Sequence, residues 1–553
     1  MDFRKRVSGC RWPLLCAVAV IGLFADQQGP DTLTYDEIIQ LYKQDVPPPI
    51  LAAKLQRLLT TPFVNDSASD GVITPVKPTL RQVGPVLRVV QWNIERGLEF
   101  DAIRFAFSDP KKFADVMEDK NSKADEHTLQ RIHDQIALLK DADLIILNEV
   151  DWGMNRTLFR NVGGELASAL NMNYAYGVEF VEVDPITMGL DHDVMIREVK
   201  DAYSEPDDKK SDIVERVKQV MRPDPSRYQG LHGTAILSRY PLRDVKLIPF
   251  QNQGHDWYAD EKKKASGFAK AQGKAGSIVF KEQIIRQVRR GGRMMLLADL
   301  VSSDLPSGRV TVVATHLEDE AAPAARRKQL EEVLHQIAPI SHPVILAGDM
   351  NTSAHDGVPT SVGRLLKDRF GSGKWWAEEG VMNAITYTTP FGLAATASKT
   401  LIGFVRSVDD PTETSIPIMG TNPEAKFFTT LEDFRFEDGG RFDFSGETER
   451  SSNGRSGKLS NSNERAEKGF VPTNELGEKF GPIGQFKLDW IFVKPGKLSD
   501  SPGASTSYVF TPCFGRTLKE LNHSIPDRIS DHNPITVELP LGEPPGMAAI
   551  SAH

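Results

Sequence analysis

The sequence predicts a layered α/β domain in which helices alternate with buried strands. Apolar residues at helical spacing twice precede an apolar run that has the length of a buried strand. The first case is Leu129, Ile132, Ile136 and Leu139 before 144–147, and the second is Leu330, Val333, Leu334 and Ile337 before 344–347. Further apolar runs at 86–90, 234–237, 294–300 and 310–314 supply other strands. This alternation is typical of sheets that are flanked by helices.

The first 25 residues have the pattern of a targeting segment. Basic Arg4, Lys5 and Arg6 precede the apolar run 13–25, and polar residues follow it. This run is shorter than the roughly 20 apolar residues that span a bilayer. We expect a signal peptide that is cleaved after Ala25 on export to the periplasm or the outside of the cell. An uncleaved membrane anchor is the alternative, and a buried helix ranks last.

Residues 26–84 are expected to form a helical extension and a linker. Ile38, Ile39 and Leu41 precede the prolines 47–49, and leucines at 51, 55, 58 and 59 follow them. This spacing predicts helical structure over 34–60 that packs on the main domain. A polar link at 65–70 then leads to the first strand of the main domain.

The main domain is expected over 85–540, followed by a flexible tail at 541–553. Three stretches break its pattern and look like insertions, near 182–228, 251–292 and 374–482. Insertions of this size usually lie at the surface or at the rim of a site, so we expect them to decide substrate choice. The stretch 445–468 has almost no apolar side chain, and we expect it to be disordered.

Composition limits the function without naming it. The chain has 553 residues and a formal net charge of −9, which argues against a protein that coats nucleic acid electrostatically. Of three cysteines, Cys10 and Cys16 lie in the targeting segment, so Cys513 has no partner for an intrachain disulfide in the body of the chain. The stretch 262–293 holds ten basic residues and one acidic residue, Glu282. It predicts a solvated face, or a docking site for a phosphate-rich substrate or an anionic lipid.

Six segments end a hydrophobic run with polar groups that suit metal-assisted phosphoester hydrolysis. Hydrolysis of a phosphodiester needs positive charge at the phosphate and an activated water, and a divalent metal supplies both. Mg²⁺ prefers oxygen ligands, which makes Glu149 the best single candidate for a metal ligand. A histidine beside a carboxylate exchanges protons near neutral pH. Taken singly, each segment also fits a strand end, an Asx turn or a structural histidine. The six segments end in Asn93, Glu149, His316, Asp349 with Asn351, Asp489, and Asp531 with His532.

The joint order of these segments resembles the endonuclease/exonuclease/phosphatase superfamily, which has the deoxyribonuclease-like fold. The resemblance covers roughly residues 85–540 without the insertions, and 233–241 and Arg156-Thr157 are similar to bacterial members. It implies a four-layered sandwich of two packed mixed β-sheets flanked by helices. The long chain would then hold one domain with large insertions.

The resemblance also implies how the chain binds its metal and its substrate. Asn93, Glu149 and Asp531 would bind the metal, which is Mg²⁺, with Mn²⁺ as the alternative. Arg156 and Thr234 would contact the substrate.

The remaining polar residues would take catalytic roles under the same resemblance. Asp349 and Asn351 would position water and phosphate, and His316 would contact the phosphate or protonate the leaving oxygen. Asp489 would orient His532, which would be a general base or would stabilise the transition state.

Some positions depart from the family pattern. Abasic-site endonucleases of the family carry an Asn-x-Tyr-x-Pro segment where this chain has Thr315-His316-Leu317, which argues against abasic-site repair. Asn148 stands where glutamine is usual, and Thr234 stands where asparagine is usual. The carboxylate that often pairs with the first histidine has Glu282 as its candidate.

The sequence therefore predicts a metal-dependent phosphoester hydrolase, with a phosphodiesterase or nuclease as the first expectation. A sphingomyelinase-like phospholipid head-group phosphodiesterase, a phosphomonoesterase and a catalytically inactive binding module are the alternatives. A lipid enzyme would need an exposed aromatic loop, for which 257–258 and 375–376 are candidates. The expected partner is the phosphoester substrate, as nucleic acid or phospholipid, and we expect no obligate protein partner.

Overall fold

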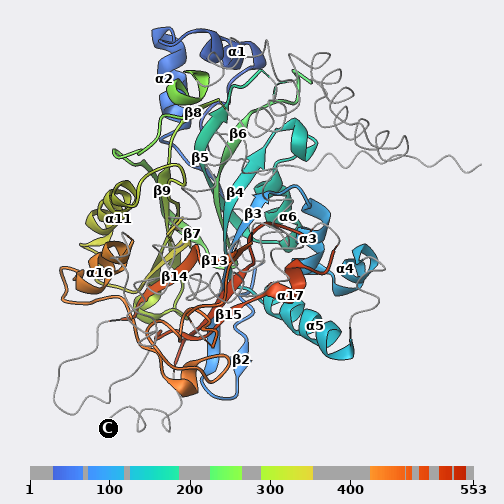
Figure 1. The fold of residues 1–553 in the computed structure, drawn as a ribbon, viewed down its shortest axis with the longest axis vertical. Coiled ribbons are helices and arrows are strands. Elements are labelled where there is room, and N and C mark those ends of the chain that lie inside the picture. Colours follow the sequence, from blue (N-terminus) through green and yellow to red (C-terminus); the bar gives the residue numbers. More distant parts are fainter. Residues whose placement is uncertain are drawn as a thin grey trace, which may run out of the picture.

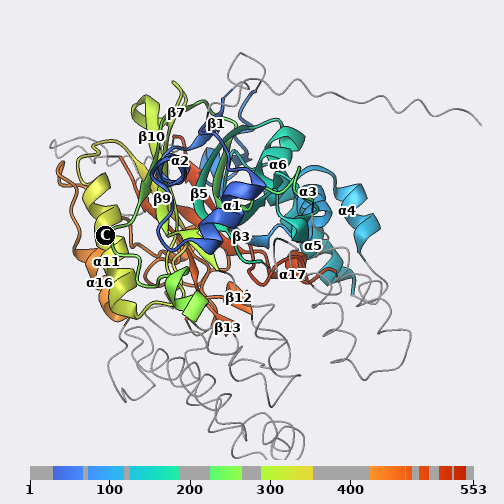
Figure 2. The same cartoon turned by 90° about the horizontal axis from the view of Figure 1, so that it is seen from above.

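Two mixed β-sheets face each other in the computed structural model, and helices cover the outer face of each sheet (Figures 1 and 2). The predicted α/β sandwich is therefore confirmed. The structure describes residues 29–66, 73–117, 125–185, 188, 224–263, 288–352, 424–467, 469–475, 485–496, 510–525 and 528–542.

The larger sheet has nine strands in the order β1-β5-β6-β4-β3-β16-β15, with β2 beside β3 and β8 beside β5. In this sheet β3 and β4 run parallel, and the other pairs are antiparallel. Its strands are β1 (Phe63–Asn65), β2 (Thr79–Leu80), β3 (Gly84–Arg96), β4 (Leu144–Trp152), β5 (Asn173–Glu182), β6 (Leu231–Ser238), β8 (Arg289–Gly291), β15 (Cys513–Thr517) and β16 (Ile535–Pro540).

The smaller sheet has five strands in the order β14-β11-β10-β9-β7. Here β10 and β11 run parallel, and the other pairs are antiparallel. Its strands are β7 (Leu242–Pro249), β9 (Met294–Val301), β10 (Arg309–His316), β11 (Val344–Asp349) and β14 (Asp489–Lys494). A separate ribbon pairs β12 (Asn474–Glu475) with β13 (Gln485–Phe486).

Helices lie outside both sheets because alternate side chains of each strand point to opposite faces. In β4, Leu144 and Ile146 enter the core between the sheets, whereas Ile145 and Leu147 pack under the outer helices. The larger sheet carries α3 (Phe100–Ser108), α4 (Pro110–Val116), α5 (Glu126–Lys140), α6 (Val162–Leu170) and α17 (Lys519–Asn522), and the smaller sheet carries α11 (Pro323–Ile337) and α16 (Ala425–Asp433). Short 3₁₀ turns are η2 (Asn155–Thr157), η3 (Pro306–Gly308) and η4 (Thr448–Arg450).

The helical extension predicted over 34–60 consists of α1 (Tyr35–Lys43) and α2 (Pro49–Leu58). Thr34 and Glu37 form a reciprocal capping box that starts α1. Apolar residues of both helices, such as Leu41 and Leu58, join the core on the outer face of the larger sheet. Arg290 of β8 donates to the carbonyl of Leu41 at 3.0 Å, so the extension is fixed to the main domain. The predicted targeting segment lies outside the described residues, and none of the described helices is long and apolar enough to span a membrane.

The expectation of disorder at 445–468 is wrong for the residues of that stretch that the structure describes. The segment has few apolar side chains, but it lies along β14, which is an edge strand of the smaller sheet. Asn463 donates to the carbonyl of Ile491 at 3.0 Å and accepts from its amide at 3.3 Å. Asn463 therefore takes the place of a neighbouring strand, and Leu459 is completely buried beside it. The segment is ordered by polar contacts with an existing sheet, which composition does not reveal.

Gly348 allows β10 and β11 to approach closely where the polar residues begin. Its φ of +150° is disfavoured for other residues, and a Cβ there would lie 1.8 Å from the carbonyl oxygen of Thr315. We predict that Gly348→Ala lowers the free energy of unfolding by roughly 3 kcal/mol or more. Urea unfolding measures this value. Gly542→Ala is the control, since its Cβ would meet no atom within 4 Å. Equal stability of the two variants would contradict the prediction.

Lys487 is completely buried just before β14, where it donates to the carbonyl of Asp489. Burial lowers the pKa of Lys487 from 10.5 to about 7. Between these values the unfolded chain binds a proton that the folded chain has released, so the free energy of unfolding rises with pH. We predict that Lys487→Met removes this rise and stabilises the fold at pH 6.

Urea unfolding between pH 6 and pH 10 tests this dependence. The control is Lys458→Met, which removes a half-exposed lysine from the same part of the fold and should keep the wild-type slope. A slope in Lys487→Met equal to that of the wild type would show that another group causes it.

Candidate active site

The candidate site lies where strands of the two sheets end next to one another. The parallel strands β3 and β4 pair Asn93 with Asn148, and the parallel strands β10 and β11 pair His316 with Asp349. β14 adds Asp489, which lies opposite Asp349 in the antiparallel register. Parallel strands place their carboxyl ends at one edge of a sheet, which is the usual position of sites in α/β folds. The sequence segments that ended in polar residues therefore come together in space.

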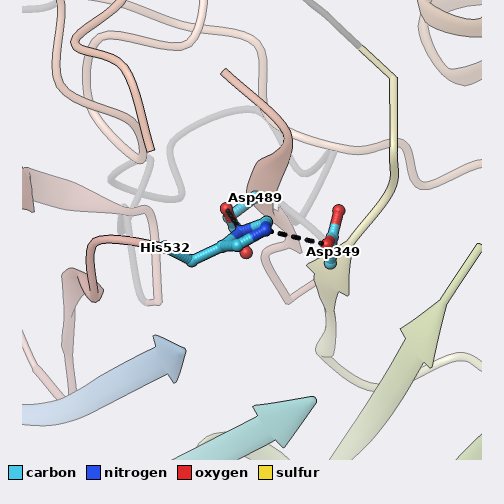
Figure 3. Close-up of side chains that lie close together, drawn as sticks. All are labelled: Asp349, Asp489 and His532. Atoms are coloured by element: carbon cyan, nitrogen blue, oxygen red, sulfur yellow. Dashed lines mark hydrogen bonds and ion pairs between the residues drawn. The ribbon is translucent and has the colours of Figure 1, made fainter. Parts of the chain in front are cut away.

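His532 lies between two buried carboxylates (Figure 3). Its Nδ1 is 2.7 Å from Oδ2 of Asp489, and its Nε2 is 3.6 Å from Oδ2 of Asp349. Burial alone would lower the pKa of His532, but the charges of Asp489 and Asp349 hold it well above its usual value. The structure thus brings Asp489 to one ring nitrogen of His532 and Asp349 near the other, while the predicted role of Asp489 in orienting His532 stays a prediction.

The Asp489 and His532 pair is held by its neighbours. Gln91 donates to Oδ1 of Asp489 at 3.0 Å, and the hydroxyl of Thr473 accepts from the Asp489 amide at 3.1 Å. The indole of Trp92 donates to the carbonyl of His532 at 2.8 Å. Burial would raise the pKa of Asp489, but the charge and hydrogen bond of His532 lower it below its usual value. The carboxylate form that orients the imidazole is therefore favoured.

The side chain of Asn148 joins the two sheets beneath the site. Its oxygen accepts from Gln91 at 3.1 Å and from the amide of Asp349 at 2.9 Å. Its nitrogen donates to the hydroxyl of Thr234 at 3.0 Å and to the carbonyl of Thr315 at 3.1 Å. The amide is completely buried, and both of its ends are hydrogen-bonded.

Glu149 belongs to a group of acidic side chains where the register of β3 and β4 shifts. Asn93 donates to Oε1 of Glu149 at 3.2 Å and to Oδ2 of Asp349 at 3.1 Å. Glu95 accepts from the amide of Asp531 at 3.0 Å. Glu95 and Glu149 have φ values of 46° and 52°, so both strands leave regular geometry at these carboxylates. Such irregular positions re-aim side chains and are common next to active sites.

This acidic group fits a divalent cation. Burial, together with the charges of Asp531 and Glu149, raises the pKa of Glu95 to about 7, and the pKa of Asp531 is also raised, first by burial. Glu149 differs, because Arg96 and nearby histidines outweigh burial and hold its pKa well below the usual value. A cation would stabilise the charged forms of these neighbouring carboxylates, and oxygen ligands suit Mg²⁺ or Mn²⁺. Asn93 contacts Glu149, and the carboxylates of Glu95, Glu149 and Asp531 lie close enough for their charges to act on one another. Cation binding by Asn93, Glu149 and Asp531 stays a prediction, to which the structure adds Glu95 as a candidate.

By distance alone, a different group among the described residues is the one that could hold a cation. Asp349, Asp489 and His532 each place one ligand atom within 4.8 Å of the others. However, Asp489 and His532 already bind each other at 2.7 Å, and a charged imidazole is not a metal ligand. The oxygen-only group around Glu149 is therefore the better candidate for the metal centre.

His316 lies at the end of β10, close to Asp349. Its Nε2 is 3.6 Å from Oδ2 of Asp349, and its Nδ1 is 2.7 Å from Nη1 of Arg293. Burial and the charge of Arg293 hold the pKa of His316 well below its usual value. Glu179 is the nearest carboxylate to Nδ1, at 3.8 Å. Glu282, the candidate partner from the sequence, lies outside the described residues.

Asn351 follows β11 and turns back toward β10. Its amide donates to Oδ1 of Asp349 at 2.9 Å, and its side-chain nitrogen donates to the carbonyl of Leu317 at 2.9 Å. With a φ of 45°, Asn351 has the left-handed conformation that asparagine tolerates. The turn therefore holds Asp349 and Asn351 together.

The two predicted substrate contacts are engaged in buried networks. Arg156 donates twice to Asp151, at 2.6 and 2.9 Å, and Asp151 also contacts Nδ1 of His232 at 2.9 Å. Thr234 donates to Glu179 at 2.6 Å and accepts from Asn148. These contacts position residues of the site, while the role of Arg156 and Thr234 in substrate binding stays a prediction.

Several residues of the site were not found from the sequence. Glu95 follows Asn93 by two positions, and this spacing on an extended strand was the available signal. Arg96 is half-buried, and its Nε has no hydrogen-bond partner among the described residues. Its charge lowers the pKa of Glu149. Glu179 and Arg293 lie beside stretches that looked like insertions, and His232 lies inside the 231–238 strand. None of these five residues stands in one of the six segments whose sequence indicates a catalytic role.

Comparison with solved structures finds matches of low sequence identity. An endonuclease/exonuclease/phosphatase from Beutenbergia cavernae is 15% identical to this chain. The match covers 83% of this chain and 72% of the Beutenbergia chain, with a TM-score of 0.34. A family protein from Leptotrichia buccalis is 10% identical, with coverages of 82% and 99% and a TM-score of 0.33. A 3′–5′ exonuclease from Neisseria meningitidis is 12% identical, with coverages of 82% and 99% and a TM-score of 0.33. TM-scores this low carry no argument about function.

No curated protein matches the chain significantly. The model of the Endonuclease/Exonuclease/phosphatase family matches residues 90–532, a range that begins in β3 and ends at His532. It therefore contains every residue of the site described above. The chain belongs to the Endonuclease/Exonuclease/phosphatase family.

Proposed function

We propose that this chain is a Mg²⁺-dependent phosphodiesterase, with nucleic acid as its first candidate substrate. Members of its family are generally phosphoester hydrolases. The observation that carries the proposal is the position of the oxygen-ligand group around Glu149 next to the His532 and Asp489 pair. Asn93 links the two parts, since it donates to both Glu149 and Asp349.

Asn93, Glu95, Glu149 and Asp531 would hold the cation. When bound, the cation would supply positive charge at the phosphate and lower the pKa of water. Mg²⁺ is the proposed ion because it accepts an all-oxygen site, and Mn²⁺ is the alternative.

The protein's own residues would divide the proton chemistry. Burial raises the pKa of Asp349 to about 7, so Oδ2 of this residue is suited to accept a proton from the attacking water near neutral pH. Its Oδ2 lies 3.6 Å from Nε2 of both His316 and His532. With Nδ1 held by Asp489, His532 would direct its Nε2–H at the oxygens that gain negative charge in the transition state.

The other candidate functions have less support. Trp257 donates to Glu318 at 2.9 Å, and Tyr258 is buried against the N-terminal extension, so neither forms an exposed aromatic loop for a lipid surface. The other candidate pair, 375–376, lies outside the described residues. A binding module would not require the two histidines and the four carboxylates that the chain keeps at Glu149, Asp349, Asp489 and Asp531. A phosphomonoesterase would use the same site, and the assay below separates it from a diesterase.

Cation binding tests the metal centre without any substrate. We predict that Mn²⁺ binds the wild-type chain in isothermal titration calorimetry and that Glu149→Gln weakens binding at least about tenfold, because an amide replaces a charged ligand. The control is Glu331→Gln on α11, which removes a half-exposed carboxylate of the same type. Unchanged Mn²⁺ affinity in Glu149→Gln would place the cation elsewhere.

Substrate hydrolysis tests the catalytic pair. The wild-type chain should hydrolyse bis-p-nitrophenyl phosphate with Mg²⁺ or Mn²⁺, and His532→Ala should lower kcat by about 10² to 10⁴. His335→Ala, an exposed histidine on α11, is the control and should keep full activity. Plasmid DNA, RNA, p-nitrophenyl phosphate and sphingomyelin, tested in parallel, identify the substrate class. Equal activity of wild type and His532→Ala would refute the proposed mechanism.

We also propose that residues 1–25 direct export, with a membrane anchor as the alternative. The support is the basic start and the apolar run 13–25. Expression of the full chain, cell fractionation and N-terminal sequencing test it. A chain that stays in the cytoplasm with its N-terminus intact would contradict export.

A further inference from the structure

The two histidines of the site are held by groups of opposite charge. His532 has a carboxylate at its Nδ1, whereas His316 has the guanidinium of Arg293 at the same ring atom, 2.7 Å away. Both rings are buried, with exposed fractions of 5% and 2%. An imidazole in a buried position takes the tautomer that its hydrogen-bond partners require.

Arg293 can only donate to His316. A guanidinium carries five N–H donors and no acceptor, so Nδ1 of His316 must be the acceptor of this hydrogen bond. Arg293 is itself 2% exposed and surrounded by carboxylates that keep it charged. Its Nη1 donates to Glu179 at 2.8 Å, its Nη2 donates to Asp319 at 3.0 Å, and its Nε lies 3.4 Å from Glu318.

Glu179 does not replace Arg293 as the partner of His316. Its Oε2 is 3.8 Å from Nδ1, which exceeds hydrogen-bond distance, and it accepts from Arg293 instead. Its other oxygen accepts from Thr234 at 2.6 Å. The carboxylate therefore fixes the arginine, and the arginine fixes the histidine.

We infer that Arg293 is a positioning residue that holds His316 as the neutral imidazole with its proton on Nε2. His316 then presents a fixed N–H donor on the side of Asp349, the side on which the reacting phosphate would bind. This use of the N–H rests on the proposed function. His316 would hydrogen-bond a phosphate oxygen without giving up its proton, and the leaving oxygen would take a proton from Nε2 of His532 or from water.

The protonation of the ring is measured directly, without substrate. In ¹⁵N-histidine-labelled protein at pH 7, the His316 signals, assigned by their loss in His316→Gln, should show an unprotonated Nδ1 and a protonated Nε2. A proton on Nδ1, or on both nitrogens, would overturn the assignment. The outcome is independent of activity, so a chain without any phosphoesterase activity still gives a decisive result.

A conservative replacement separates a hydrogen-bond donor from a proton donor. The side-chain amide of glutamine presents an N–H where His316 has Nε2–H, but it does not exchange a proton near neutral pH. With bis-p-nitrophenyl phosphate we expect kcat of His316→Gln to stay within about tenfold of wild type, whereas His316→Ala should lose about 10² to 10³. Equal loss in both variants would show that His316 transfers a proton.

Removal of the guanidinium tests the role of Arg293 itself. In Arg293→Met the His316 ring should no longer be held in one tautomer, and its ¹⁵N signals should show that Nδ1 is partly protonated. Arg289→Met is the matched control, because Arg289 is a buried guanidinium paired with Glu182 and does not contact His316. An unchanged His316 signature in folded Arg293→Met would refute the inference. If circular dichroism shows that Arg293→Met is unfolded, the ¹⁵N signals of His316 in the wild-type chain decide whether the inference holds.

Discussion

The geometry of the site depends on the buried amide of Asn148. The side-chain oxygen of Asn148 accepts hydrogen bonds from both sheets, and its side-chain nitrogen donates hydrogen bonds to both sheets. Each such hydrogen bond contributes roughly 1 kcal/mol net, but a buried amide left without a partner costs about 1–3 kcal/mol. A relative shift of the sheets would break several of these bonds together. The amide therefore fixes the register between the proposed cation ligands on β3 and β4 and the proposed catalytic residues His316 and Asp349 on β10 and β11.

Electrostatics then give similar residues different states. His532 lies between Asp489 and Asp349 and favours the charged form, while His316 lies against Arg293 and favours the neutral form. Among the acids, Asp489 is held as a carboxylate by His532, whereas Asp349 has a pKa near 7 because burial outweighs its favourable contacts. Groups with well-separated protonation states a few ångströms apart are typical of sites that handle protons.

The fold and the main polar residues could be predicted because the polar residues directly follow hydrophobic runs that form strands. The run 144–147 ends in Asn148 and Glu149, and the run 344–347 leads to Asp349. Arg293 and Glu179 could not be predicted, since their function depends on a contact between β5 and the start of β9. The sequence signal for Glu95 was only its spacing of two positions from Asn93. The irregular backbone that turns Glu95 toward Asp531 cannot be seen in an alternating strand pattern.

The error over 445–468 has consequences for the site. The segment was judged by its own lack of apolar residues, whereas its polar side chains bind the free edge of β14. β14 starts at Asp489, and the neighbouring residue Thr473 accepts hydrogen bonds from the amides of Leu488 and Asp489. The carboxylate that orients His532 is thus held on one side by β11 and on the other by residues of the insertion. The insertion therefore supports the Asp489 and His532 pair, because without it β14 would have one unpaired edge beside Asp489.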